Sequence, residues 1–149
     1  MSFSHVNEKG EARMVDIGEK PIVHREAEAR GKIFLKAETI ELIRANRIKK
    51  GDVLSTARIA AICGGKKTSE LIPLCHNIPI NRIEVSFEIQ EDGVEIIARA
   101  SCDARTGIEM ETLTAVSIAA LTIYDMCKSV DKEMLISDIR LVEKKKGTG

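Results

Sequence analysis

The segment 110–127 is almost devoid of charge until Asp125, and Lys128 follows that residue three positions later. At about 100° per residue, a helix of this segment places apolar side chains on two opposite faces. One face carries Leu113, Val116, Ala120, Ile123 and Cys127, and the opposite face carries Ile118 and Leu121. Such a helix must be covered by more than one neighbour. Its two charged groups are therefore costly unless they are paired or used.

The pair Asp125 and Lys128 allows two interpretations. In the last turn of a helix, the negative end of the helix dipole favours the ammonium of Lys128 and disfavours the carboxylate of Asp125. The first interpretation is an ordinary ion pair at a frayed helix end. The second is a functional pair held on a buried helix, and the pair alone does not decide between them.

The composition limits the class of protein. The chain has 149 residues, which suits one compact domain. Lys and Arg number 23 and Asp and Glu number 23, so the formal net charge is +0 and a nonspecific nucleic-acid binder is disfavoured. With no Trp, three Phe and one Tyr, there is no set of aromatic rings on which unpaired bases could stack. The core must be aliphatic.

The cysteines and the hydropathy pattern bear on location. Four cysteines stand far apart without a CxxC pair, at positions 63, 75, 102 and 127, so no zinc or redox motif is predicted and we expect no metal. The first residues do not resemble a signal sequence, and no apolar run approaches the length of a membrane span. We therefore expect a cytoplasmic protein with free thiols and no membrane partner.

Propensity and periodicity predict the order of the elements. Residues 14–25 offer an extended segment that is broken at Gly18 and Pro21. Strands are expected at 32–36, 82–89, 94–102 and 134–142, with a hairpin at 91–93. Helices are expected at 37–46, from an Asp52 cap to 63, in a short turn at 69–72 capped by residue 68 or 69, and at 110–127. The glycines at 64–65 are expected to end the second helix.

This order predicts an α+β fold, the ferredoxin-like βαββαβ arrangement, with an antiparallel sheet, helices on one face and an inserted helix after the first. We expect a flexible N-terminus at 1–12, one domain at 13–143 and a basic flexible tail at 144–149. Each helix of such a fold needs only one apolar face. The excess apolar surface of 110–127 therefore predicts a second burial surface supplied by another subunit.

Two groups of polar residues lie at loops or helix ends. His76 lies in a short loop between Pro73 and Pro79, where it can be a hydrogen-bonded structural residue or a well-positioned functional imidazole. The lysines at 50, 66 and 67 lie beside glycines, which suits either solvated turns or an anion site. No Walker or GxGxxG pattern is present, so a standard nucleotide cradle is not predicted.

Glu109 and Glu111 lie at the start of the long helix, where acids interact favourably with the helix dipole. If Glu111 also belongs to a site with Asp125, the 14 residues between them correspond to about 21 Å of helix. One small-molecule pocket in one chain cannot easily use both. Either Glu111 is structural, or the site is completed across a subunit boundary.

Several long motifs carry a resemblance to a known family. They are KGDVLSTARIA at 50–60, LIPLCH at 71–76, TGIEME at 106–111, LTAV at 113–116 and YDMCK at 124–128, with MVD at 14–16. In this order they resemble the molybdenum cofactor biosynthesis protein C family, the cyclic pyranopterin monophosphate synthases. The resemblance runs from about residue 5 to the tail.

The resemblance implies a lyase that works without a cofactor. It would convert (8S)-3',8-cyclo-7,8-dihydroguanosine 5'-triphosphate to cyclic pyranopterin monophosphate and release diphosphate, in molybdenum cofactor biosynthesis. It also implies a ferredoxin-like fold and a homohexamer, a trimer of dimers, with sites at subunit interfaces.

The resemblance implies roles for named residues. Asp125 would be the catalytic acid or base, with Lys128 as its partner. The substrate-binding residues would be Leu74, Cys75, His76, Met110, Glu111, Glu109, Lys50, Lys66 and, more weakly, Arg25. The lysines would bind the triphosphate and stabilise the departing diphosphate. The family's tail often reads GGKSG, whereas this chain ends in KKGTG, so the role of the tail is open.

Without the resemblance, two other functions remain. One is a noncatalytic ferredoxin-like regulator that binds a small anionic ligand and leaves it unchanged. The other is a nucleic-acid binder, which would need a basic face that the balanced charge does not suggest.

Overall fold

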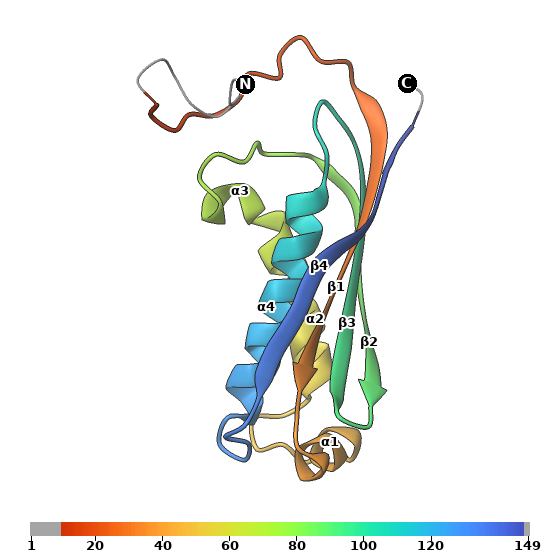
Figure 1. Cartoon of the computed structure of the whole chain (residues 1–149). Coiled ribbons are helices and arrows are strands. Elements are labelled where there is room, and N and C mark those ends of the chain that lie inside the picture. Colours follow the sequence, from red (N-terminus) through yellow and green to blue (C-terminus); the bar gives the residue numbers. More distant parts are fainter. Residues whose placement is uncertain (1–9, 148–149) are drawn as a thin grey trace.

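A four-stranded sheet and two long helices build the protein, and the computed structural model describes residues 10–147 (Figure 1). The strands are β1 (Val23–Phe34), β2 (Ile80–Gln90), β3 (Gly93–Ala104) and β4 (Leu135–Lys146). The helices are α1 (Ala37–Arg44), α2 (Val53–Lys66), α3 (Thr68–Leu71) and α4 (Glu109–Cys127).

The sheet has the order β2-β3-β1-β4, and every neighbouring pair is antiparallel. With the chain order β1, three helices, β2, β3, α4 and β4, this topology confirms the predicted ferredoxin-like α+β fold. The long helices α2 and α4 lie on one face of the sheet (Figure 1). α1 lies at the end of the molecule where α4 finishes, and α3 lies near the end where α4 begins.

The predicted stop of the second helix at 64–65 is wrong, because α2 continues to Lys66. A β-carbon on Gly64 would lie 2.7 Å from Ile118 Cγ1, and one on Gly65 would lie 3.3 Å from the carbonyl oxygen of Glu111. The two glycines therefore serve close packing of α2 against α4. They also cover part of the excess apolar surface of α4 within the chain, so that Leu121 and Tyr124 remain its exposed large side chains in the last two turns.

β1 begins at Val23, well before the predicted strand at 32–36, and is longer than predicted. Residues 14–22 are not strand, because the Asp16 carboxylate accepts a hydrogen bond from the backbone N–H of Gly18 and fixes a turn there. Residues 32–34 of the predicted strand at 32–36 form the end of β1, and residues 35 and 36 lie outside it. Small residues at the core face, Ala27, Ala29 and Gly31, gave no clear strand signal, yet they let β1 pack directly beneath the helices.

The predicted hairpin is confirmed, with Glu91 and Asp92 connecting β2 to β3. Asp52 caps α2 as predicted, because its Oδ1 accepts the backbone N–H of Ser55 at 3.1 Å. The predicted side-chain cap of the short helix is wrong: α3 has Lys67 at its N-cap without such a bond. The Thr68 hydroxyl instead donates to the carbonyl oxygen of Gly65.

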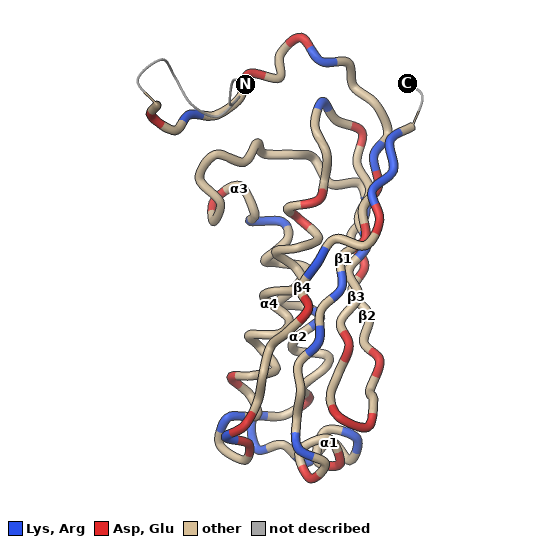
Figure 2. The backbone as a smooth tube through the Cα atoms, viewed as in Figure 1, with Lys and Arg blue, Asp and Glu red and all other residues tan. Residues whose placement is uncertain are grey.

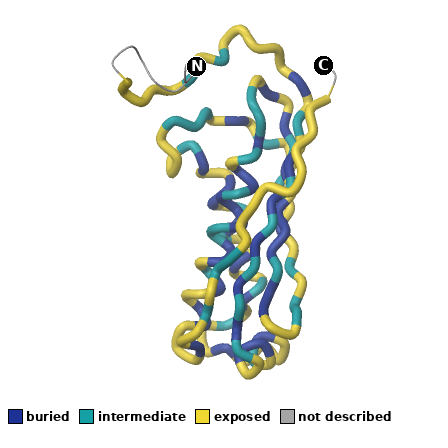
Figure 3. Tube along the Cα trace, viewed as in Figure 1, coloured by how far each residue is buried: buried dark blue, intermediate teal, exposed yellow. Residues whose placement is uncertain are grey.

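The last strand extends beyond its predicted end. Residues 144–146, predicted to belong to a flexible tail, pair with residues 25–27 of β1 as part of β4. β4 is an edge strand with two register irregularities, and Asp138 in it adopts a φ of 58°. It is exposed along most of its length (Figure 3). The remaining tail residues 148–149, and residues 1–9 of the predicted flexible N-terminus, lie outside the described residues.

Candidate functional site

The predicted site residues gather in two groups at opposite ends of α4. The middle of α4 is uncharged between its acidic beginning and the charged residues near its last turn (Figure 2). Since α2 and α4 pack with Gly65 beside Glu111 and Gly64 beside Ile118, the end of α2 that carries Lys66 lies near the start of α4. Glu111 and Asp125 therefore lie at opposite ends of α4 and do not share one pocket within a single chain, as the helix length predicts.

The first group, the Asp125 cluster, consists of Asp125, Lys50 and Lys128. Asp125 Oδ2 lies 3.0 Å from Lys50 Nζ, and Asp125 Oδ1 lies 3.1 Å from Lys128 Nζ. Lys50 also donates to the carbonyl oxygen of Asp125 at 3.2 Å, which supplies a cation at the C-terminal end of the helix. Each carboxylate oxygen therefore faces one ammonium.

The Asp125 cluster is not shielded from water within one chain. The side chains of Asp125 and Lys128 are 56% and 58% exposed, so the expected burial of this pair is wrong for a single chain. At this end of α4 the side chains of Ile123 and Cys127 are buried in the core, whereas those of Asp125 and Lys128 face solvent. Hydrogen bonds from Lys50 and then Lys128 lower the pKa of Asp125. The carboxylate is therefore ionised at neutral pH.

The second group lies at the start of α4, and Glu111 is its most unusual member. Glu111 is 3% exposed, and its Oε1 atom has no hydrogen-bond partner among the described residues. Burial raises the pKa of Glu111 to about 7, a nearby Glu109 adds to the rise, and its own backbone N–H opposes it. A buried polar oxygen without a partner is rare in folded proteins and calls for an explanation, such as a ligand that binds it.

Glu109 is held in a different way. Burial opposes its ionisation, but its own backbone N–H and the ammonium of Lys144 outweigh that effect, so the pKa of Glu109 is lowered. Lys144 Nζ lies 3.0 Å from Glu109 Oε1. Sequence reasoning missed Lys144 because it counted this residue as part of the tail. Its only signal was the basic run at 144–146, which β4 brings alongside α4.

Arg25 points its guanidinium toward the loop before α4. Its Nε donates to the carbonyl oxygen of Ala104 and its Nη2 donates to that of Arg105. It also contributes to lowering the pKa of Glu109, which places it near the second group. Part of the hydrogen-bonding capacity of Arg25 is thus used to hold the chain between β3 and α4.

The 74–76 loop also lies in this region. Burial, followed by the charges of Glu111 and Glu109, raises the pKa of the Cys75 thiol. His76 Nε2 lies 2.6 Å from the carbonyl oxygen of Val15, so that nitrogen carries the proton and donates. His76 therefore has a structural partner in the N-terminal segment. Its neighbour Leu74 is half-buried.

The remaining predicted residues are on the surface. Lys66 is exposed at the end of α2, and Met110 is 36% exposed in the first turn of α4. Gly64 and Gly65 are buried within α2 where it packs against α4 and β2, so their backbone is not open to an anion beside Lys66. Any anion bound near Lys66 would be held by side chains.

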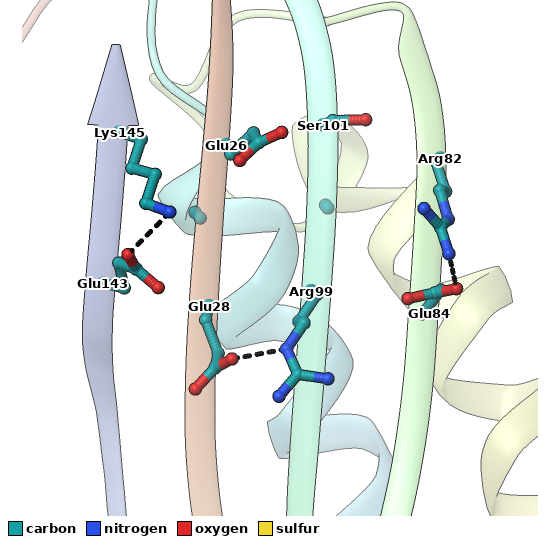
Figure 4. Close-up of a pocket in the computed structure, with 10 residues that line it drawn as sticks. Glu26, Glu28, Arg82, Glu84, Arg99, Ser101, Glu143 and Lys145 are labelled. Carbon is teal, nitrogen blue, oxygen red and sulfur yellow. Dashed lines mark hydrogen bonds and ion pairs between the residues drawn. The ribbon is translucent and has the colours of Figure 1, made fainter.

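A hollow of about 310 Å³ lies on the face of the sheet opposite the helices (Figure 4). Its charged side chains are largely paired with one another: Glu28 with Arg99, Glu84 with Arg82, and Glu143 with Lys145. None of the predicted site residues lines it. With its charges neutralised in this way, the hollow is a weaker candidate for an anionic ligand than either end of α4.

Two features of residues 10–147 concern metal ions and membranes. No group of three or more His, Cys, Asp or Glu residues is placed there to hold a metal ion. No helix in that range has both the length and the apolar character needed to cross a membrane.

The burial of Glu111 leads to a testable prediction for how the free energy of unfolding depends on pH. The folded chain raises the pKa of Glu111 above its ordinary 4.5, so it favours the protonated form. As pH rises from 4.5 to 7, the unfolded chain ionises first and wild-type stability falls, by on the order of 2–3 kcal/mol. Glu111→Gln has no such ionisation. In urea unfolding, its stability relative to wild type should therefore be higher at pH 8 than at pH 5.

The matched control is Glu91→Gln, the same change at an exposed position of the hairpin. Its stability relative to wild type should stay nearly constant between the two pH values. An equally constant difference for Glu111→Gln would show that Glu111 is ionised at little cost in the fold.

The fold and the two groups define a ferredoxin-like α+β protein that presents paired carboxylates and ammonium groups at both ends of one helix. Such groups suit proton transfer on an anionic small molecule. The chain belongs to the MoaC family, whose sequence profile matches residues 14–147.

Curated relatives extend this result over nearly the whole chain. A protein of Peptoclostridium acidaminophilum named cyclic pyranopterin monophosphate synthase is 56% identical over 147 residues, which cover 99% of this chain and 94% of the relative. A protein of the same name from Thermomicrobium roseum is 52% identical, with coverage of 97% and 89%. A third, from Clostridium acetobutylicum, is also 52% identical, with coverage of 97% and 91%. The family expected from the sequence motifs is thus confirmed.

Proposed function

We propose that this chain is a lyase that forms cyclic pyranopterin monophosphate from (8S)-3',8-cyclo-7,8-dihydroguanosine 5'-triphosphate and releases diphosphate. The observation that carries the proposal is the Asp125 cluster, a carboxylate held between two ammonium groups, in a chain of the MoaC family. The relatives' shared name supports the product.

The Asp125 cluster provides both partners of a proton transfer. Lys50 and Lys128 lower the pKa of Asp125, so Asp125 starts as a carboxylate. In the first step it either accepts a proton itself or orients an ammonium group that donates one. Lys128, the C-cap residue of α4, places its Nζ 3.1 Å from Asp125 Oδ1 and is the proton donor in this step. Together they perform the proton transfers of ring opening and pterin closure.

Lys50 has a second role in this proposal. Its ammonium binds the triphosphate and stabilises the negative charge that develops on the departing diphosphate. Phosphate oxygens then compete with Asp125 for Lys50 Nζ. When the ammonium turns to the phosphates, Asp125 loses one of the two cations that lower its pKa, and it becomes a stronger base.

The second group contributes recognition. Glu111 Oε1 is buried without a partner, and in the proposed complex a polar group of the substrate satisfies it. Glu109, Cys75, His76, Leu74 and Met110 line the same end of α4, with Lys66 and Arg25 as further cations. The whole set is proposed as the substrate-binding side of the site.

The two groups come together across a subunit boundary in this proposal. About 21 Å of helix separates Glu111 from Asp125, so the second chain supplies the other half of each site. Exposed apolar side chains on α4 and β4, among them Leu121, Tyr124, Leu135 and Leu141, support such an interface. We propose the homohexamer that the sequence resemblance implies, a trimer of dimers with shared sites.

The proposed setting is the cytoplasm. The four cysteines are unpaired, with Cys102 and Cys127 buried in the core, as expected in a reducing compartment.

The direct test is turnover of the cyclised triphosphate. The purified protein should release diphosphate and form cyclic pyranopterin monophosphate, detected by a coupled diphosphate assay and by mass spectrometry. Binding of the triphosphate without diphosphate release would identify a noncatalytic ligand-binding protein and reject the proposal.

A substitution at Lys50 tests its phosphate role. Lys50→Ala should weaken triphosphate binding by roughly tenfold to a hundredfold, since it removes a charge-assisted contact. The loss should shrink as salt concentration rises, because salt screens the attraction that wild type retains. Isothermal titration at two salt concentrations measures both effects. Lys49→Ala, the adjacent exposed lysine, is the control, and equal affinities of wild type and Lys50→Ala would remove Lys50 from the phosphate site.

A further inference from the structure

We infer that Asp131 is a positioning residue that fixes where Lys50 stands relative to Asp125 and Lys128. The inference rests on the function proposed above for those three residues. It assigns to Asp131 no contact with the substrate.

The carboxylate of Asp131 is almost fully buried, and both of its oxygens accept hydrogen bonds. It is 1% exposed. Its Oδ2 accepts hydrogen bonds from the backbone N–H of Lys36 and the hydroxyl of Thr39, each at 2.9 Å. Its Oδ1 accepts the backbone N–H of Glu133 at 3.0 Å. Burial opposes the ionisation of Asp131, but these donors outweigh it and lower its pKa. A buried carboxylate is tolerated only with such partners.

Two of these donors belong to the start of α1. The N-cap residue of α1, Lys36, makes no side-chain capping bond of its own. The carboxylate of Asp131 instead reaches this helix end from the segment after α4, where its negative charge also faces the favourable end of the α1 dipole. α1 is therefore held at its first turn by a residue that belongs to the far end of the chain.

Asp131 is also hydrogen-bonded to the end of α4. Its backbone N–H donates to the carbonyl oxygen of Cys127, the last residue of α4, at 3.0 Å. Asp125 and Lys128 lie within one or two turns of that point. On the other side, α1 ends at Arg44, and the chain reaches Lys50 six residues later through the buried Ile48. One carboxylate thus links the segment that carries Lys50 to the helix end that carries its partners.

A purely structural anchor would affect stability without affecting the Asp125 cluster. A positioning residue must also change the electrostatic environment of Asp125. The pKa of the Asp125 carboxyl reports that environment directly, because the hydrogen bond from Lys50 is the largest cause of its lowering. This pKa can be followed in the folded protein by carbon NMR, whether or not the protein turns over the proposed substrate.

The experiment compares wild type, Lys50→Ala, Asp131→Asn and Ile96→Val. Ile96 lies fully buried in the core, so its variant is a control for lost stability. The pKa of Asp125 should rise in Lys50→Ala and should rise in the same direction in Asp131→Asn, whereas Ile96→Val should leave it unchanged. Turnover at saturating substrate should fall roughly tenfold to a hundredfold in Asp131→Asn, since small misplacements of reacting groups are costly.

An Asp125 pKa that rises in Lys50→Ala but not in Asp131→Asn overturns the inference. An unchanged pKa in Lys50→Ala overturns it as well, because Lys50 would then not govern the cluster. If Asp131→Asn does not fold, Thr39→Val removes one of the same hydrogen bonds with little change of shape, and its Asp125 pKa is read in the same way. Absence of turnover in wild type would reject the proposed function alone.

Discussion

Asp125→Asn is expected to lower the turnover number by roughly a hundredfold to ten-thousandfold, the range that a positioned acid or base contributes. The amide keeps the size of the side chain, but it cannot take up or pass on a proton. It also no longer attracts Lys50 and Lys128, whose ammonium groups lie 3.0 and 3.1 Å from the carboxylate. Because the shape of the side chain is kept, the assembly should stay intact. Diphosphate release and light scattering measure the two parts of this prediction.

The matched control is Asp92→Asn. Asp92 is also an exposed carboxylate in an ion pair, with Lys32 Nζ at 2.6 Å, but it lies in the β2–β3 hairpin. Its variant should retain turnover. Product formation at the wild-type rate by Asp125→Asn would rule out proton transfer by this carboxylate and leave it as a surface ion pair.

Mixing two inactive variants is expected to restore activity if each site takes its two groups from different chains. Asp125→Asn damages one end of α4, and Glu111→Ala damages the other. A mixed pair of chains then contains one site in which both contributing groups are wild type. With equal amounts and free exchange of subunits, about one quarter of wild-type activity should return. The measurement is diphosphate release after unfolding the variants together and refolding them.

The control for mixing is Asp125→Asn with Lys128→Ala, which both damage the same group. Every site in that mixture contains at least one damaged residue, so activity should not return. If neither mixture recovers although mass spectrometry detects mixed assemblies, each site lies within one chain. The distance between Glu111 and Asp125 along α4 would then exclude one of them from the site.

Most of the fold could be predicted from the sequence. Period-2 alternation in β2, the Asp-Gly hairpin and the long apolar run of α4 each gave the correct element. The sequence failed where a residue served tertiary packing instead of its local preference. Gly64 and Gly65 lie within α2 because α4 passes close to them, and the alanines of β1 face the helices although they are weak strand formers.

The contacts of the candidate site could be predicted from the sequence only in part. The pairing of Asp125 with Lys128 follows from their spacing, but the additional bond to Lys50 depends on how the segment between α1 and α2 lies against the end of α4. Lys144 could not be found, because a lysine in a basic tail has no local sign that it will reach Glu109. The buried, unpartnered oxygen of Glu111 is a property of packing, and the helix-dipole argument alone explained that residue as structural.

The irregular edge strand β4 affects how readily a single chain would aggregate. An open strand of this length would offer unpaired backbone groups to any extended peptide and could seed aggregation. Its two register irregularities and the left-handed conformation at Asp138 interrupt the flat geometry that such growth requires. The lysines at 144–146 add mutual repulsion at the strand's end. β4 thus carries its own protection against uncontrolled polymerisation.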